Sequence, residues 1–194
     1  RPLFPEDYLC EVQVLVTLIS SDPEIMPDSM ACLAASAALA VSDVPIKEII
    51  SEVRVSRVNG QFVVNPTRSE MEKSDMDFLI AATDKNLMMV EGEAKECSEA
   101  DLCKALEIAH DAIRIQVKAQ EELRDMAGAK PKRDYTKPAT DEALKTKVYA
   151  FAQQKVYEVA KGGLSKHERT DRFDAIKAEL TEYLKKEANL AECE

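Results

Sequence analysis

Four acidic residues stand close together in the sequence, immediately before an apolar run that is typical of a strand. They are Glu70, Glu72, Asp75 and Asp77, and the strand-like run begins at Phe78. Carboxylates brought together in this way can ligate a hard cation such as Mg²⁺ through oxygen. They can equally form a charged turn that stays in water, and acid-rich turns are common. From residue types alone, the solvated turn is the favoured interpretation.

Most other motifs for chemistry are absent from the sequence. Its five glycines form neither GxGxxG nor GxxxxGK[ST], so no loop is predicted to cradle a phosphate group. No GxSxG nucleophile elbow is present. His110 and Asp111 are neighbours on a predicted helix, where adjacent side chains point apart and cannot form an acid/base pair. We therefore interpret His110 as structural and His167 as a surface residue.

Cysteine usage and hydropathy favour a cytoplasmic protein. None of the five cysteines forms a CxxC pair, and their odd number argues against a closed set of disulfides. Two histidines far apart in the sequence also argue against structural zinc. No apolar run is long enough to span a membrane, and no signal peptide is recognisable. The first residue is Arg, and an opening within RPLFPEDY indicates a fragment or a processed piece.

Charge is distributed unevenly along the chain. Residues 1–128 contain 12 basic and 24 acidic side chains, whereas residues 129–194 contain 14 basic and 12 acidic ones. The acidic body lacks the basic surface that announces a nucleic-acid-binding protein, although it does not exclude such a partner. The sequence PKR at 131–133 could contact phosphate, but a short basic cluster is usually only solvated, and that interpretation is favoured.

The beginning of the chain predicts a strand followed by a helix. Residues 11–20, EVQVLVTLIS, are apolar on both faces and predict a central strand. Asp28 is expected to cap a helix over about 29–42. That helix is rich in alanine, so it can lie close to a sheet, with Ala35 or Ala38 facing inward.

Two hairpins and a long helix follow. Asn59-Gly60 between strand-forming runs predicts a type I′ turn, which needs positive φ at both positions. A second hairpin is predicted by DFLIAA, the turn TDKN and the run LMMVEGE. Ser98 opens a helix with a long apolar stripe, and Gly128 ends it. The order of elements predicts an α+β fold, with helices packed on a mainly antiparallel sheet.

The rest of the chain predicts a separate small all-α domain. Residues 128–140, GAKPKRDYTKPAT, have no periodicity and read as a linker that makes few contacts and is cut first by proteases. Ser165 and Glu168 form a capping box between two helices. We therefore divide the chain into a first domain over 1–128, a linker over 129–139 and a helical domain over 140–194.

Three stretches of the sequence, together with the helical tail, carry a family resemblance. They are RPLFPEDYLCEVQVLVTLIS, AASAALAVSDVPI and NGQFVVNPTRSEMEKSDMDFLIAATDKNLMMVEGEA. In this order they resemble the bacterial polynucleotide phosphorylases, and the resemblance runs over the whole chain. It implies that the first domain is the C-terminal part of the first of two RNase PH-like cores. The helical domain would then be the one that links the two cores.

The resemblance implies an activity for the intact protein. The family degrades RNA from the 3′ end with inorganic phosphate, releases nucleoside diphosphates and can run in reverse as a nucleotidyltransferase. It forms a homotrimeric ring that admits single-stranded RNA, needs Mg²⁺ in the second core, and has no membrane partner. This piece is expected to be structural, inactive alone and without a cofactor. The family's RNA-gripping arginine loop lies upstream, which leaves Arg1 as a minor RNA-binding residue. The alternative is a stand-alone protein-interaction module with no RNA role.

The resemblance also implies that the acid cluster is not catalytic. In the second core of the family, an Asp stands six positions before the Asp of the motif, and a Lys stands two positions after it. Here these three places hold Met71, Asp77 and Leu79, so only Asp77 matches. The serine run that binds phosphate in that core reads PDS at 27–29, and Asp28 would repel phosphate. We therefore expect no catalytic residue and no metal ligand in this chain.

Overall fold

The structure, a computed structural model, describes residues 2–188 and divides into two compact units. Unit 1 runs to Lys137, and unit 2 begins at Pro138. Arg1, the predicted minor RNA contact, lies outside the described residues. The helices and strands in chain order are α1 (Asp28–Val41), β1 (Ser51–Val58), β2 (Gln61–Val64), α2 (Arg68–Met71), β3 (Ser74–Ala82), β4 (Leu87–Ala94), α3 (Glu99–Met126), α4 (Glu142–Lys161) and α5 (Lys166–Ala188).

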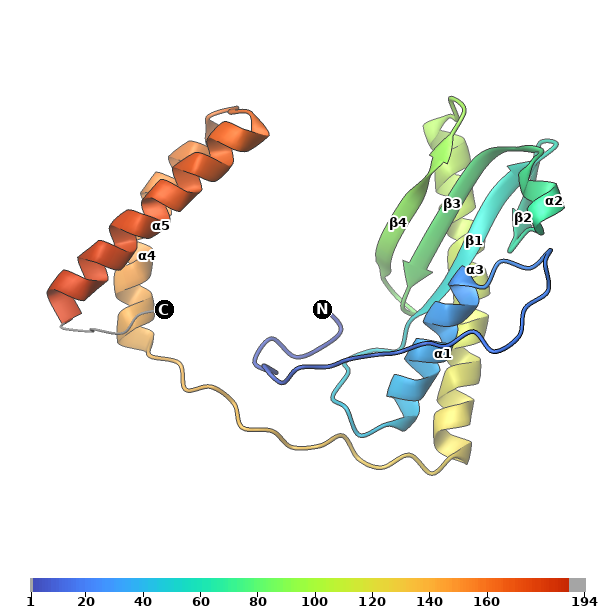
Figure 1. The fold of residues 1–194 in the computed structure, drawn as a ribbon, viewed down its shortest axis with the longest axis horizontal. Coiled ribbons are helices and arrows are strands. Elements are labelled where there is room, and N and C mark those ends of the chain that lie inside the picture. The colour runs from blue at the N-terminus through green and yellow to red at the C-terminus, as the bar shows by residue number, and fades with distance from the viewer. Residues whose placement is uncertain (1, 189–194) are drawn as a thin grey trace. The chain divides into compact units, whose positions relative to one another are not determined.

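Unit 1 contains a four-stranded antiparallel sheet in the order β2-β1-β3-β4 (Figure 1). Both predicted hairpins are confirmed, because β1 pairs with β2 and β3 pairs with β4. Asn59 and Gly60 have φ values of 52° and 79°, which are the positive values that a type I′ turn requires. Strand β3, which carries Asp77 and Leu79, therefore lies next to β1 at the centre of the sheet.

The long helix α3 covers one face of this sheet (Figure 1). Ser98 caps the helix as predicted, since its hydroxyl accepts the backbone N–H of Asp101 at 3.1 Å. Helix α1 packs against both α3 and β1. The predicted α+β class, with helices packed on an antiparallel sheet, is confirmed. The aliphatic core between the sheet and the helices contains Ala40, Ile49, Val53, Val55, Met76, Ile80, Ala82, Ala105, Ala109, Ile113 and Val117.

The prediction of a central strand at residues 11–20 is wrong. This stretch forms neither helix nor strand and lies outside the sheet. Its side chains are exposed except for the half-buried Val12, and Leu15 and Ile19 are exposed by 82% and 93%. An apolar, β-prone run becomes a strand only where a neighbouring backbone pairs with it. Within residues 2–188 no other segment pairs with this one. The sequence shows a preference for strand conformation, and the described chain offers no partner strand.

Two details of α1 also differ from the predictions. Asp28 is the first helical residue and not the cap, because Pro27 occupies the N-cap position without a side-chain hydrogen bond. Ala38 is exposed and Ala35 is only half-buried, so neither faces the core fully. The helix is rotated relative to the prediction, and its inward face carries hydroxyl groups as well as a methyl group. The buried residues of α1 are Ser29, Ser36 and Ala40.

We expect Ser36→Val to lower the free energy of unfolding of unit 1 by about 1–3 kcal/mol. The Ser36 hydroxyl accepts the backbone N–H of Ile50 at 3.2 Å and is 5% exposed. Valine removes this acceptor and adds a methyl group where little space is free. Ala38→Val, on the exposed face of the same helix, is the matched control and should change stability by about 0.5 kcal/mol or less. Urea unfolding followed by NMR signals of β1 measures both, and equal losses would contradict this orientation of α1.

Unit 2 is a hairpin of the two helices α4 and α5. The predicted capping box at the start of α5 is confirmed. Ser165 N–H donates to the Glu168 carboxylate at 3.1 Å, and Glu168 N–H donates to the Ser165 hydroxyl at 3.4 Å. The rings of Phe151 and Tyr183 stack with 4.8 Å between centroids and join the two helices. Among the described helices, none combines the length and the apolar character that crossing a membrane requires.

Candidate functional site

The acids between positions 70 and 77 do not converge on a common point. The Glu70 carboxylate accepts the N–H of Thr67 at 2.8 Å and closes a capping box around the start of α2. Asp75 forms a two-point pair with Arg57, at 2.8 and 3.0 Å, and this hydrogen bonding lowers the pKa of Asp75. Glu72 is exposed at the end of α2. Each of these acids therefore has its own surroundings, as in a charged turn.

The remaining acid of this group, Asp77, lies on the sheet face that points away from the apolar core. Ser56 and Arg54 on β1 are directly opposite Asp77 and Leu79 on β3, so these four side chains share one face. Arg54 Nη1 donates to Asp77 Oδ2, while Arg54 Nη2 donates to Oδ2 of Asp28 at the start of α1. One guanidinium group thus bridges two carboxylates that are far apart in the sequence.

The charges of this cluster stabilise one another. Burial alone raises the pKa of Asp28, but hydrogen bonds from Arg54 and from the N–H of Ser29, at 2.8 Å, outweigh burial and leave that pKa lowered. Burial likewise lowers the pKa of Arg54, and its two carboxylate partners outweigh this and raise it. The Ser56 hydroxyl donates to Asp77 Oδ1 at 3.0 Å. The cluster therefore holds two negative charges and one positive charge in direct hydrogen-bonded contact.

The two apolar positions singled out in the sequence border the same cluster. Met71 Sδ lies 3.1 Å from the Ser56 hydroxyl oxygen. Leu79 is the direct cross-strand neighbour of Arg54. Arg54 thus joins positions 28 and 77, and positions 71 and 79 lie at the border of the same cluster.

The sequence reasoning missed Arg54 and Ser56, the two residues of β1 that complete the cluster. Arg54 is 17% exposed, and its main chain is fixed by Asn65, which accepts its N–H at 2.9 Å and donates to its carbonyl at 2.7 Å. Its buried Nε has no hydrogen-bond partner among the described residues. The alternation in EVRVSRV places both residues on the polar face of β1, and this was the available signal. Their acidic partners are too distant in sequence for any spacing rule.

The cluster does not fit a magnesium ion or a phosphate group. Magnesium requires free carboxylate oxygens together with water in octahedral geometry. Arg54 instead occupies one oxygen of both Asp28 and Asp77 and already supplies their counter-charge. The open hollow beside Asp77, of about 210 Å³, is lined by the cation Lys95 as well as by Asp75 and Glu93. Within residues 2–186, whose side chains the structure describes, no three His, Cys, Asp or Glu residues are arranged to hold a metal.

His110 is part of the packing between α3 and the end of β3. Its Nε2 lies 3.0 Å from the carbonyl oxygen of Thr83. The neighbouring Asp111 carboxylate points elsewhere and pairs with Arg114 at 3.0 Å. The two residues therefore form no acid/base pair, in agreement with the directions of adjacent side chains on a helix.

Comparison with known proteins identifies the domain that carries this cluster. Residues 48–112 match the model of the 3′ exoribonuclease family, domain 2, also described as RNase_PH_C. The matched region includes all four strands of the sheet and the first half of α3. It therefore contains Arg54, Ser56 and Asp77, while Asp28 lies before it.

Similar sequences extend over nearly the whole chain. A polyribonucleotide nucleotidyltransferase of Christiangramia forsetii is 51% identical over 180 residues, which is 93% of this chain and 24% of that protein. The protein of the same name from Phocaeicola vulgatus is 51% identical over 189 residues, or 96% and 27% of the two chains. That from Cytophaga hutchinsonii is 45% identical over 185 residues, or 95% and 26%. The chain spans about a quarter of the length of these relatives. With an RNase PH domain match at residues 48–112 and this likeness on both sides of it, the chain corresponds in sequence to one part of a polyribonucleotide nucleotidyltransferase.

Proposed function

We propose that this chain is a structural, non-catalytic part of a phosphate-dependent 3′-to-5′ exoribonuclease. The matched exoribonuclease domain and the names of the relatives support this reaction class. In the intact protein, inorganic phosphate attacks the last phosphodiester bond of RNA and releases a nucleoside diphosphate, and the reaction is reversible. The chain supplies the C-terminal part of the first RNase PH-like core and the helical domain that follows it.

The observation that carries the non-catalytic role is the ion-pair cluster of Arg54. Transfer at phosphorus depends on cations placed against the phosphate oxygens, from metal, lysine or arginine. By resemblance to the catalytic core, Met71 and Leu79 stand where an acid and a lysine are required. Asp77 is the only matching residue, and Arg54 pairs it with the carboxylate of Asp28. The guanidinium charge of Arg54 is therefore neutralised by the carboxylates of Asp28 and Asp77.

The remaining parts of the proposal concern the intact protein. Catalysis, with Mg²⁺, takes place in the second core, and three copies form a ring in the cytoplasm whose channel admits single-stranded RNA. Exposed apolar residues between positions 9 and 19 support a role in assembly, because extended apolar surface marks interaction sites. They include Leu9, Val14, Leu15, Val16, Leu18 and Ile19.

The chain alone should release no ADP from poly(A) in the presence of Mg²⁺ and inorganic phosphate. The expected rate is that of the reaction without protein, because no cation of the cluster is free to face a phosphate group. A full-length member of the family under the same conditions is the positive control, and ADP is measured by chromatography.

One result would overturn this role. ADP release that requires phosphate and disappears in Asp77→Asn would mean that the cluster around Arg54 retains an active site. Release that survives Asp77→Asn and varies between preparations would instead identify a contaminating nuclease, and the comparison is then repeated with protein from a host that lacks the enzyme.

A further inference from the structure

The segment 129–137 forms no helix or strand, yet it is bound along the surface of unit 1. Its first anchor is Lys132, whose ammonium group donates to the carbonyl oxygens of Leu39, Ala40 and Ser42 at 2.9, 3.3 and 2.8 Å. These carbonyls belong to the C-terminal end of α1, where the last turn contains no basic residue of its own. Helix C-termini carry unpaired carbonyls and partial negative charge, which a lysine satisfies. Lys132 thus supplies hydrogen bonds to the C-terminal carbonyls of a helix some ninety residues away in the sequence.

The second anchor lies at the next residue. The backbone N–H of Arg133 donates to the carbonyl oxygen of Asp43 at 2.7 Å. Its guanidinium group pairs with the Asp43 carboxylate at 2.5 Å, and this hydrogen bond lowers the pKa of Asp43. Main chain and side chain of Arg133 therefore both bind the residue just after α1.

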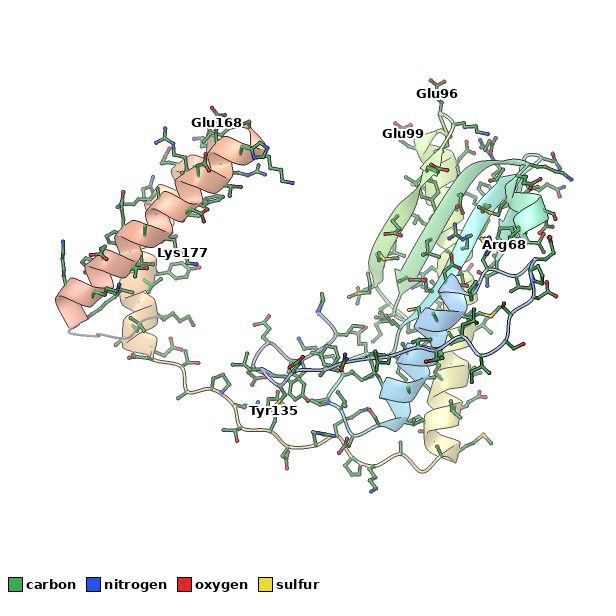
Figure 2. The ribbon with its side chains drawn as sticks, in the orientation of Figure 1. Arg68, Glu96, Glu99, Tyr135, Glu168 and Lys177 are labelled. Carbon is green, nitrogen blue, oxygen red and sulfur yellow. The ribbon has the colours of Figure 1, made fainter. Side chains whose placement is uncertain are left out.

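The third anchor joins the segment to the beginning of the chain. The ring of Tyr135 meets the ring of Tyr8 edge-on with 4.9 Å between centroids, and Tyr8 is buried. The Tyr135 hydroxyl donates to the carboxylate of Asp7 at 2.6 Å, and Lys137 reaches the other oxygen of Asp7 at 3.1 Å. Figure 2 shows Tyr135 where the segment passes the N-terminal residues.

We propose that residues 129–137 form a latch, which sets the length of the free connection between unit 1 and helix α4. With the latch closed, the free residues are 138–141, which span at most about 14 Å when fully extended. With the latch open, residues 129–141 are free and span at most about 45 Å. The latch therefore controls how far the helical unit can move from its point of attachment.

The contacts of the latch are suited to reversible opening. Of the side chains that anchor the latch, Lys132, Arg133 and Lys137 are exposed and Tyr135 is half-buried. Ion pairs and hydrogen bonds at exposed positions contribute little stability each and weaken with salt. Local opening of such a segment requires no unfolding of the sheet or of α3. The sequence prediction of a linker with few contacts is wrong for this segment, because its partners lie near residues 7, 8 and 39–43.

Amide hydrogen exchange at Arg133, measured by NMR on the whole chain, tests the latch. The Arg133 N–H is bonded only in the closed state, so it should be protected in the unsubstituted protein. Lys132→Met should raise its exchange rate about fivefold, because the carbonyls at the C-terminal end of α1 then lose their lysine partner. Lys130→Met removes the same charge two residues earlier and should leave the rate unchanged. Exchange in β1 and β3 should be the same in all three proteins, which shows that unit 1 stays folded.

A second measurement asks whether the three anchors act together. Hydrogen bonds from Tyr135 and Lys137 lower the pKa of Asp7. If the latch opens as one unit, Lys132→Met should raise the pKa of Asp7 towards its ordinary value, as seen in the carboxyl carbon shift during an acid titration. An unprotected Arg133 amide in the unsubstituted protein would overturn the latch. An Asp7 pKa unaffected by Lys132→Met would also overturn it, because the contacts would then be independent.

Discussion

Arg54→Met should lower the free energy of unfolding of unit 1 by about 2–3 kcal/mol. Removing one partner of a fully buried ion pair costs about 3–5 kcal/mol, because the other charge is left without compensation. Here Arg54 is 17% exposed and its partners Asp28 and Asp77 are 36% and 19% exposed, so water recovers part of that cost. Methionine keeps much of the apolar stem of arginine. The loss of stability therefore reports mainly on the carboxylates of Asp28 and Asp77, which are left without a counter-charge.

Hydrogen exchange of amides in β1 and β3 is the suitable measurement, because helices α4 and α5 of unit 2 also contribute to a far-UV signal. Arg68→Met, on the exposed face of α2, is the matched control and should change stability by about 0.5 kcal/mol or less. If Arg54→Met were as harmless as this control, the bridge would contribute nothing. The proposed reason for the absence of chemistry at this site would then fail.

The same variant has a pH dependence whose sign follows from Asp28. The pKa of Asp28 is lowered in the folded protein from 3.8. A lowered carboxyl pKa contributes stability that is present above the unfolded pKa, about 3.9, and is lost as pH falls through the folded pKa. Arg54→Met removes the part of this contribution that comes from Arg54 and leaves the part that comes from the N–H of Ser29. The stability difference between the two proteins should therefore be full at neutral pH and should shrink as the pH falls below about 4.

Partial rescue distinguishes charge from shape. In the Arg54→Met background, Asp77→Asn removes one of the two uncompensated charges and should recover part of the lost stability. In the unsubstituted background the same change should destabilise, because the guanidinium group loses a partner. The two effects of opposite sign form a double-mutant cycle with a coupling free energy of about 1–3 kcal/mol. Effects of the same sign would show that Asp77 and Arg54 do not depend on each other.

Local sequence signals predicted the parts of the fold that depend on neighbouring residues. Asn59-Gly60 fixed the first hairpin because few residues other than these tolerate positive φ. Ser98 and Ser165 marked helix starts because their hydroxyl groups accept backbone N–H groups within the next turn. Each of these contacts joins residues three positions apart, so the residue types alone are enough to predict it.

Contacts between distant residues were the ones that sequence reasoning missed. The partners of Arg54 lie 23 and 26 residues away; the register of β1 and β3 brings Asp77 to it, and the packing of α1 against β1 brings Asp28. Residues 11–20 have strand-forming side chains, but pairing needs a second backbone that no pattern within the segment can supply. Residues 129–137 have the polar composition of a free linker. Their partners lie about 90 to 130 residues earlier in the chain, where no local pattern can indicate them.

The largest loss of stability is expected from Gly92→Ala, at about 3 kcal/mol or more. Gly92 on β4 pairs with Phe78 on β3 and has φ of 156°. A Cβ at this position would lie 2.1 Å from the carbonyl oxygen of Asp77 and 2.8 Å from the Cα of Phe78. Both are backbone atoms of the neighbouring strand and cannot turn aside like a side chain. The strands must separate, and overpacking and backbone strain, at about 1–3 kcal/mol each, then add together.

Gly60→Ala separates this clash from the conformational cost of replacing a glycine. Gly60 has φ of 79° in the first hairpin, and an added Cβ there would meet nothing within 4 Å. Its loss should be only about 1–2 kcal/mol, the cost of a left-handed backbone for an L-residue. Exchange of β1 and β3 amides measures both variants, and a Gly92→Ala chain that fails to fold while Gly60→Ala folds also meets the expectation. Stability of Gly92→Ala within about 1 kcal/mol of the unsubstituted protein would show that β4 does not approach Asp77 so closely. Asp77 lies on β3, where its carbonyl oxygen is next to Gly92, and its carboxylate binds Arg54 of β1. A separation of β4 from β3 would therefore also disturb the ion-pair cluster.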